Sequence, residues 1–446
     1  MASTTYTGCR YFCRKIREGA LRFPGEELLL PTAPALSIYD SLDPQLRYLI
    51  ADSWSGLSGQ ITSAFALLYL AQQTQRIAIL PSWHDEGHYG DSIIPMSLLF
   101  DLEGLREATG LLFVELDDVK PQDPHHVNTT MDEIGCYRAS PWFDIPLSLP
   151  DHNIHQTILT IPLPSETPWS YESFTLFDFS PSRLSLAATQ ASSNGWSLPR
   201  NMVEEDPSPQ GGGLLCYTNL WDLGHVAGGV RRVEENGHFG NGGFESAKES
   251  RMVGLLKADL KGVHPEWWHV GRFVDFTPEI WDIALSSVYE TLEVDVLPPL
   301  VTVHLRRGDF LSWCPQQQNC TPPASDYAAA VKPLLSLFNS SIIPFSSSPR
   351  PRVLVTTDET TDMDFLASID QLGWDRINHT RLGTERKLRE AYGEAWRWAD
   401  SAVDQAILSL GQHFVGTRGS QVTQLSQLRV ESWNGGQTAV VDRPAN

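Results

Sequence analysis

The stretch VTVHLRRGDFLSW, residues 301–313, decides how the second half of this chain is interpreted. It begins as an apolar run with β-branched residues, typical of a buried strand, and then changes to two arginines, a glycine and an aspartate. Ligands of open α/β sheets bind beyond the carboxyl ends of the strands, which is where Arg306 and Arg307 stand. His304 lies two residues before Arg306, so we expect both side chains on one side of the strand. The alternative is a solvated basic turn with Asp309 as a local ion-pair partner.

Outward from this stretch, short apolar runs rich in β-branched residues alternate with helical patterns. The runs that predict buried strands cover residues 76–82, 110–116, 300–305, 351–357 and 412–417. Apolar residues at helical spacing predict helices over 59–75, 278–292 and 325–338. This alternation indicates an α/β fold built around parallel sheets.

The length of 446 residues exceeds that of one typical domain. Residues 200–250 contain three glycine-rich clusters with little periodicity, and we interpret them as a long loop or a partly disordered excursion. The segment LEVDVLPP has the composition of a linker, which puts a domain boundary near residue 295. We therefore expect an N-terminal extension (1–45), an N-terminal domain (46–295) and a C-terminal domain (296–446).

The charge balance limits the partners of the chain. Lys and Arg total 33 against 54 Asp and Glu, a formal net charge of −21. Such a surface repels nucleic acid and anionic membranes, so we expect neither as a general partner, whereas a small anion can bind where arginines concentrate. No apolar run reaches the ~18 residues of a membrane helix, and no apolar stretch follows the basic residues of the N-terminus. We expect no membrane segment and no signal peptide in this sequence.

The six cysteines are too few for a disulfide scaffold. Cys314 and Cys320 lie close together in a predicted loop. They can form a small disulfide-closed ring in an oxidising compartment or remain two free thiols, and the sequence leaves both readings open.

Two glycine-rich turns, one in each half, directly precede helical patterns. SWSGLSGQIT (53–62) supplies Gly56, Ser58 and Gly59, and HFVGTRGSQ in the second half supplies Gly419 and Ser420. A turn of this kind presents backbone N–H groups and the positive end of the helix dipole to an anion. The alternative is that these residues only cap their helices.

A third candidate is VLVTTDE (353–359), another predicted strand, which ends in the hydroxyl of Thr357 and the carboxylate of Asp358. The alternative is that these residues only cap a helix. Arginine binds phosphate oxygens through two parallel hydrogen bonds, and histidine can donate to a further oxygen. Two anion-binding turns and an arginine pair fit a nucleotide diphosphate held between two domains.

Competing chemistries find little support. The sequence contains neither the phosphate-binding loop GxxxxGK[ST] nor the nucleophile elbow GxSxG. His84 and His88 are spaced as in a zinc-binding helix, but Pro81 and Gly87 favour a loop there and no glutamate follows the first histidine. We therefore expect no metal site, and metal-dependent hydrolysis is the weakest of the hypotheses.

Three motifs in this order, HLRRGDF after a strand, TTDE at a strand end and HFVGTRGSQ before a helix, resemble the GDP-fucose protein O-fucosyltransferase family, its fungal-type members in particular. SGLSGQ stands where that family has a glycine-rich loop, and the resemblance runs from about residue 50 to 440. It implies a GT-B fold, in which two Rossmann-like domains face a central cleft. It also implies fucose transfer from GDP-fucose to a protein or oligosaccharide hydroxyl, with inversion, without metal or cofactor, in the lumen of the ER or Golgi.

The resemblance also implies roles for four residues. Arg306 matches the catalytic arginine that stabilises the departing GDP, and His304 matches the donor-site histidine of the same strand. Asp404 stands where the family has an aspartate that recognises guanine, and Ser420 where a hydroxyl binds phosphate.

The sequence departs from the family pattern in the first glycine-rich turn. Ser58 and Gly59 occupy the region where relatives usually have asparagine. Ser55 stands where some relatives have a catalytic glutamate, and the nearest carboxylate is Asp52. We therefore assign no general base, and the alternative function is that of a catalytically silent relative that binds nucleotide sugar or glycan.

Overall fold

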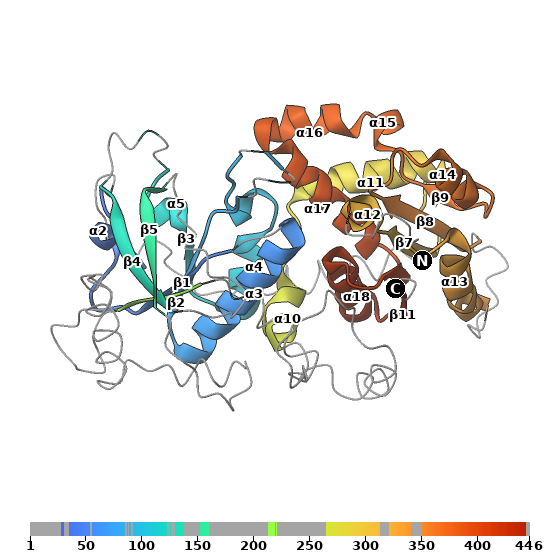
Figure 1. The fold of residues 1–446 in the computed structure, drawn as a ribbon. Coiled ribbons are helices and arrows are strands. Elements are labelled where there is room, and N and C mark those ends of the chain that lie inside the picture. The colour runs from blue at the N-terminus through green and yellow to red at the C-terminus, as the bar shows by residue number, and fades with distance from the viewer. Residues whose placement is uncertain are drawn as a thin grey trace, which may run out of the picture.

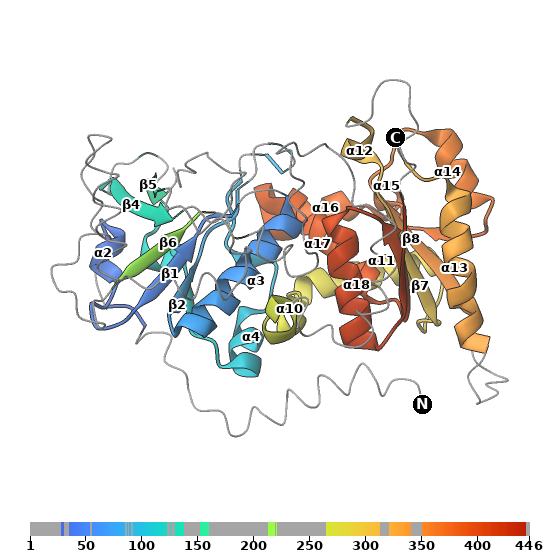
Figure 2. The ribbon, with the colours of Figure 1, turned by 60° about the horizontal axis from the view of Figure 1, so that its bottom comes forward.

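The computed structural model shows two α/β units, each built around an all-parallel sheet (Figures 1 and 2). It describes residues 28–442 except for gaps at 31–34, 54–55, 85–86, 88, 91, 123–124, 126–129, 138–151, 160–212, 219, 221–264, 313–320 and 340–349. No helix among the described residues is long and apolar enough to span a bilayer.

The N-terminal sheet has six strands in the order β3-β2-β1-β6-β4-β5. The strands are β1 (Tyr48–Ala51), β2 (Ile77–Leu80), β3 (Phe113–Glu115), β4 (Asp132–Tyr137), β5 (Ile154–Leu159) and β6 (Leu214–Tyr217). The helices of this unit are α2 (Ile38–Ser41), α3 (Leu57–Thr74), η2 (Met96–Leu98), α4 (Leu102–Thr109), α5 (Leu116–Val119), α10 (Pro265–His269) and η6 (Gly271–Phe273). Helix α3 is buried along nearly its whole circumference, because the sheet covers one side and α10, α17 and α18 cover others.

The C-terminal sheet has five strands in the order β11-β10-β7-β8-β9. The strands are β7 (Leu300–Leu305), β8 (Arg352–Thr357), β9 (Asp375–Arg376), β10 (His413–Thr417) and β11 (Thr438–Val441). The helices are α11 (Pro278–Leu292), α12 (Gly308–Ser312), α13 (Ala324–Asn339), α14 (Met363–Asp370), α15 (His379–Leu382), α16 (Thr384–Tyr392), η7 (Gly393–Ala395), α17 (Trp396–Ser409) and α18 (Gln421–Asn434). Alternate residues of β7 face α13 and α14 on one side and α17 and α18 on the other.

The structure confirms the parallel α/β architecture, all five predicted strands and the three predicted helices. The interpretation of residues 200–250 as a loop throughout is wrong at β6, which pairs in parallel with β1 in the middle of the sheet. This strand has only four residues, LLCY, and is buried on both faces, so it shows no alternation that the sequence could reveal.

The two units share a hydrophobic core that runs from α3 into α11 and α17. Although α11 precedes the boundary predicted near residue 295, it packs on α16 and α17 of the C-terminal unit. The domain limits themselves stay a prediction.

A disulfide joins two neighbouring strands of the N-terminal sheet. Cys136 of β4 and Cys216 of β6 are both fully buried, and their Cα atoms lie 4.4 Å apart. The 80 residues that separate them in the sequence gave no reason to pair them. The ring suggested for Cys314 and Cys320 lies outside the described residues.

Candidate active site

The hydroxyl of Thr417, at the end of β10, fixes the turn that follows β7. Its oxygen accepts a hydrogen bond from the N–H of Arg306 at 2.9 Å, while the hydroxyl donates to the carbonyl oxygen of His304 at 3.2 Å. The phenol of Tyr327 on α13 lies 2.7 Å from the same oxygen. Burial raises the pKa of Tyr327 to about 12, so the phenol keeps its proton and donates. The backbone that presents the two arginines is therefore held by buried bonds.

Arg306 stands at the carboxyl end of the sheet with its side chain 24% exposed. Its guanidinium forms an ion pair with Asp358, which follows β8. The other carboxylate oxygen of Asp358 accepts from the backbone N–H of Arg307 at 2.8 Å. A Cβ added at Gly308 would collide with this carboxylate, so the close approach requires glycine. Asp358 thus orients the guanidinium of Arg306 and leaves it within reach of solvent.

Arg307 has a different environment although it is the next residue. Its guanidinium donates to Glu359 at 3.3 Å, to the Thr321 hydroxyl at 3.0 Å and to Asp362 at 2.8 Å. It also stacks over the ring of Phe365 at 3.9 Å from the centroid. This arginine supports the loop, because each of its three guanidinium nitrogens donates to a side chain of the protein.

His304 is buried beneath this edge of the sheet, and its Nδ1 lies 3.0 Å from the hydroxyl of Thr423 on α18. Burial lowers the pKa of His304 to about 4, the neighbouring carboxylates of Asp358 and Asp404 oppose that shift, and the charge of Arg306 adds to it. The imidazole is therefore neutral at physiological pH. The charges of Asp358, Arg306 and Asp404 all act on this imidazole, so these four predicted residues lie near one end of the sheet.

Asp404 belongs to α17 and pairs with a histidine that the sequence analysis did not single out. Nε2 of His379 lies 3.0 Å from Oδ1 of Asp404, and Nδ1 of His379 lies 3.1 Å from the Thr384 hydroxyl. Burial lowers the pKa of His379, but the charge and hydrogen bond of Asp404 and the charge of Asp400 outweigh it and raise the value to about 9. Burial raises the pKa of Asp400 to about 6.

Gly419 and Ser420 form the start of α18. Gly419 has φ +83°, a conformation that favours glycine, and Ser420 is the N-cap residue whose side chain accepts from the N–H of Thr423 at 3.4 Å. The hydroxyl of Thr423 accepts the N–H of Thr417 at 3.1 Å, so this helix start is tied to the end of β10 beside His304. Both predicted residues therefore shape a helix N-terminus directed at the same edge of the sheet.

The N-terminal turn opens α3. Gly56 is the N-cap residue and has no side chain that could accept a hydrogen bond from the helix. The backbone N–H of Leu57, the first residue of the helix, donates to the hydroxyl of Tyr89 at 3.3 Å. Ser58 and Gly59 are buried in the first turn of the helix, and Ser58 Oγ has no hydrogen-bond partner among the described residues.

Asp52, at the end of β1, is also buried beside this turn. Its Oδ1 accepts the N–H of Ser53 at 2.7 Å, whereas Oδ2 has no partner among the residues that the structure describes. Burial raises the pKa of Asp52 well above its ordinary value. Burial therefore favours the protonated form of this carboxyl and weakens it as a base.

An aromatic pair connects the N-terminal turn to the C-terminal unit. The ring of Tyr89 stacks on Trp398 of α17, with centroids 4.2 Å apart and planes inclined by 29°. The indole N–H of Trp398 donates to the carbonyl oxygen of Ser92 at 3.2 Å. The start of α3 therefore lies against the helix that carries Asp404 (Figure 2).

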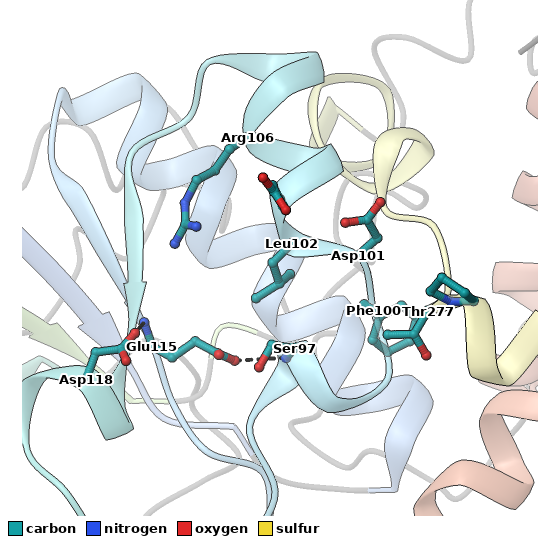
Figure 3. Close-up of a pocket in the computed structure, with 10 residues that line it drawn as sticks. Ser97, Phe100, Asp101, Leu102, Arg106, Glu115, Asp118 and Thr277 are labelled. Atoms are coloured by element: carbon teal, nitrogen blue, oxygen red, sulfur yellow. Dashed lines mark hydrogen bonds between the residues drawn. The ribbon is translucent and has the colours of Figure 1, made fainter. Parts of the chain in front are cut away.

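Two cavities accompany these residues. One, of about 650 Å³, lies between α15, α16 and α17 and is lined by His379, Asp400 and Trp396 among others. The other, of about 320 Å³, lies in the N-terminal unit (Figure 3), where Glu115 accepts the N–H of Ser97 at 2.9 Å. The charged residues that line this second cavity are four acids and one arginine, so its net charge repels a diphosphate, and it shares no residue with the arginine site.

The metal hypothesis rested on two histidines. His84 contributes its carbonyl oxygen to a bond from Gln60 Nε2 at 2.7 Å, and His88 lies outside the described residues. In the described part of the chain no three His, Cys, Asp or Glu side chains gather as metal ligands would.

Sequence reasoning missed several residues on which the site depends. Thr417 lies within the quoted motif HFVGTRGSQ and Thr423 two residues after it, so their hydroxyls were a visible signal. Tyr89, Trp398 and His379 gave none, because their partners lie elsewhere in the sequence.

The fold and site together define a class. Two parallel α/β units in one chain are the architecture of the GT-B fold, and an arginine, a neutral histidine and a helix N-terminus lie at the carboxyl edge of the second sheet, where open α/β sheets bind ligands.

The family follows from the sequence match. The family model for GDP-fucose protein O-fucosyltransferase matches residues 48–431, so the chain belongs to that family and is a fucosyltransferase. No curated protein matches the sequence.

Solved structures of fucosyltransferases resemble the chain at low identity. POFUT1 in complex with GDP-fucose is 11% identical, with 91% of this chain and 99% of that chain covered and a TM-score of 0.48. NodZ alpha-1,6-fucosyltransferase soaked with GDP-fucose is 13% identical, with coverages of 86% and 93% and a TM-score of 0.38. The fucosyltransferase NodZ from Bradyrhizobium is 12% identical, with the same coverages and TM-score.

Proposed function

We propose that this enzyme transfers fucose from GDP-fucose to a hydroxyl of a protein or glycan acceptor, with inversion at the anomeric carbon and without a metal. The observation that carries the proposal is the group at the carboxyl end of the C-terminal sheet. There a solvent-accessible guanidinium, a neutral imidazole and the start of α18 converge in a protein with a net charge of −21.

In the proposed reaction the acceptor oxygen attacks the anomeric carbon of fucose from the face opposite the diphosphate. The bond from that carbon to the β-phosphate oxygen breaks, GDP leaves with the electron pair, and the acceptor hydroxyl gives its proton to solvent water. Negative charge grows on the β-phosphate, and Arg306 stabilises it. A preorganised donor of this kind stabilises the transition state more than the ground state.

The other groups bind the donor. The hydroxyl of Thr423 accepts from the N–H of Thr417 and can donate its own proton to Nδ1 of His304. This arrangement puts the imidazole proton on Nε2, where it can donate to a phosphate oxygen without adding charge. The N–H groups at the start of α18 after Gly419 and Ser420, and those of α3 after Gly56, supply further donors.

The predicted carboxylates take different roles in this proposal. Asp358 would repel a phosphate, and its two bonds to residues 306 and 307 support a role in holding Arg306. Asp404 accepts the adjacent N1–H and N2–H donors of guanine, which adenine does not offer. Asp52 does not serve as a general base in this scheme, because burial favours its protonated form.

The location and subgroup complete the proposal. The buried Cys136–Cys216 disulfide is typical of a chain that matures in an oxidising compartment, which supports the lumen of the ER or Golgi. Membership of the fungal-type subgroup stays a prediction.

The test is a thermal-shift panel of GDP, GDP-fucose, ADP and UDP, followed by a transfer assay. A ligand that binds the native state raises the unfolding temperature, so GDP and GDP-fucose are expected to do so selectively. The enzyme is then incubated with GDP-fucose in buffer containing EDTA, and release of GDP is measured. Equal shifts for all four nucleotides contradict the donor, and release that requires added metal contradicts the metal-free mechanism. A rate indistinguishable from buffer favours the catalytically silent alternative.

A further inference from the structure

We propose that His379 is a positioning residue that presents the carboxylate of Asp404 to the guanine base. The inference rests on the proposed function and concerns how the same site selects its nucleotide.

The imidazole of His379 is held on both nitrogens. It lies at the start of α15, after Asn378, whose side chain caps that helix by accepting the N–H of Arg381 at 3.0 Å. Nδ1 reaches the hydroxyl of Thr384 on α16 at 3.1 Å, and Nε2 reaches Oδ1 of Asp404 on α17 at 3.0 Å. Three helices therefore fix the direction of the bond to Asp404.

The charges around this pair favour a cationic imidazole. Two carboxylates of α17, Asp400 and Asp404, stand one helical turn apart and both act on His379. Two anions so close repel each other, and a cation between them stabilises the ionised form. The pKa of His379 is about 9 and that of Asp400 about 6, so the imidazole is positively charged at pH 7 and donates from both nitrogens.

The geometry leaves Asp404 free to receive a base. Among the described residues no protein group bonds to Oδ2 of Asp404, and Oδ1 retains a lone pair after the bond from His379. Guanine donates N1–H and N2–H in one plane, so it requires both carboxylate oxygens in that plane. The histidine sets the rotation of the carboxylate about its Cβ–Cγ bond, and this rotation decides whether both donors can be accepted.

A cavity adjoins His379, and Asp404 lies behind the imidazole, outside the residues that line this cavity. It has a volume of about 650 Å³, and His379, Asp400 and Trp396 line it together with charged side chains of α16 (Glu385, Arg386, Arg389 and Glu390). Space is thus available beside the imidazole on the side of α15 and α16.

The experiment is a double-mutant cycle on the full chain, read by calorimetric binding of GDP and ADP. His379→Ala is expected to raise the Kd for GDP about tenfold and to change the Kd for ADP little, because adenine lacks the two donors. In the Asp404→Ala background the same substitution is expected to have no further effect on GDP. His379→Gln, which keeps a neutral N–H donor, is expected to restore part of the affinity.

The matched control is His413→Ala. This histidine lies in the same unit, accepts the N–H of Gln437 at 3.0 Å and lies outside the proposed site. It is expected to bind GDP as the wild type does. Should His379→Ala fail to fold, His379→Gln takes its place in the cycle, with a smaller loss of GDP affinity that again vanishes in the Asp404→Ala background.

The outcomes separate the two proposals. A wild-type protein that binds neither GDP nor GDP-fucose refutes the proposed function and this inference with it. If the wild type binds GDP but the His379 and Asp404 losses simply add, or if GDP and ADP weaken equally, the positioning role alone is refuted.

Discussion

Replacing Arg307 by alanine is expected to destabilise the C-terminal unit, whereas the same change at Arg306 is expected to remove catalysis and leave stability nearly unchanged. The prediction follows from the surroundings of the two guanidinium groups. That of Arg307 is 11% exposed and donates to Glu359, Asp362 and Thr321. That of Arg306 is 24% exposed and forms an ion pair with the carboxylate of Asp358, itself 25% exposed.

The magnitude for Arg307 follows from what the substitution leaves behind. Breaking a buried ion pair by removing one partner costs about 3–5 kcal/mol, because the other charge stays buried. Glu359 keeps three hydrogen bonds from Thr361 and from the N–H of Asp362, which limits the loss to about 3 kcal/mol. For a unit of this size each kcal/mol lowers the unfolding temperature by about 2–4 °C, so a drop of about 6–12 °C is expected.

The magnitudes for Arg306 are reversed. A partly exposed ion pair contributes at most about 1 kcal/mol to stability. The loss of one preorganised donor to the leaving diphosphate costs about 3–4 kcal/mol in the transition state, a hundred- to thousandfold decrease in kcat. Arg306→Lys is expected to recover little, because an ammonium group cannot form the planar two-bond contact.

The assay pairs thermal unfolding of both alanine variants with the kinetics of GDP release at a temperature where each is folded. Arg307→Lys serves as the second variant, because one ammonium cannot satisfy three separate acceptors and should leave most of the destabilisation in place. An Arg307→Ala protein that unfolds at the wild-type temperature refutes the stability argument. Small and equal kinetic losses in the two alanine variants refute the assignment of Arg306.

Three further predictions concern other parts of the structure. The chain-entropy model gives about 4–5 kcal/mol for a ring of this length, so replacing Cys136 and Cys216 by alanine should lower the free energy of unfolding, measured in urea, by up to that amount. Free thiols at both positions in peptide mapping of the native protein would contradict the disulfide. Burial raises the pKa of Glu359, but the hydrogen bonds from N–H groups, a hydroxyl and Arg307 outweigh burial and hold the pKa at about 2. The ionised carboxylate therefore stabilises the fold fully above about pH 4.5, and this stabilisation is lost as the pH falls towards 2. Measuring the free energy of unfolding across this pH range should show the loss. Gly416→Ala places a methyl group against the side chain of Thr423, so weaker GDP binding is expected while the N-terminal unit stays folded. Unchanged GDP binding would show that this contact does not matter.

The sequence was most informative where strands are buried on both faces. The runs at β7, β8 and β10 are nearly continuous apolar stretches, because parallel strands covered by helices on both sides have no polar face, and their bounds were predicted almost to the residue. Strands β1 and β6 are equally buried and have four residues each, as β2 has. Strand β6 directly follows a glycine-rich cluster, which favoured a loop, and its parallel neighbours in the sheet show that it is a strand.

The site was predictable only as far as it is local. Residues that end a strand or open a helix, such as Arg306 and Ser420, can be recognised from a few neighbouring letters. The hydrogen bond from His379 to Asp404 joins residues 25 apart, and the bond from the Arg306 N–H to Thr417 joins residues 111 apart. These pairs depend on how whole helices and strands pack, which a single sequence does not reveal.

The two adjacent arginines acquire opposite roles because side chains alternate along a strand. Val301, Val303 and Leu305 face α13 and α14, and Arg307 continues that series into the carboxylates beside α14. Residues 302 and 304 face α17 and α18. Arg306 follows them at the carboxyl edge, the side from which Asp404 and the start of α18 act on His304. At physiological ionic strength the Debye length is about 8 Å, so the net charge of the whole surface reaches this edge only weakly. One arginine is thus enclosed by acidic partners and the other is left accessible, which fits the proposal that this acidic protein binds a diphosphate at a single place.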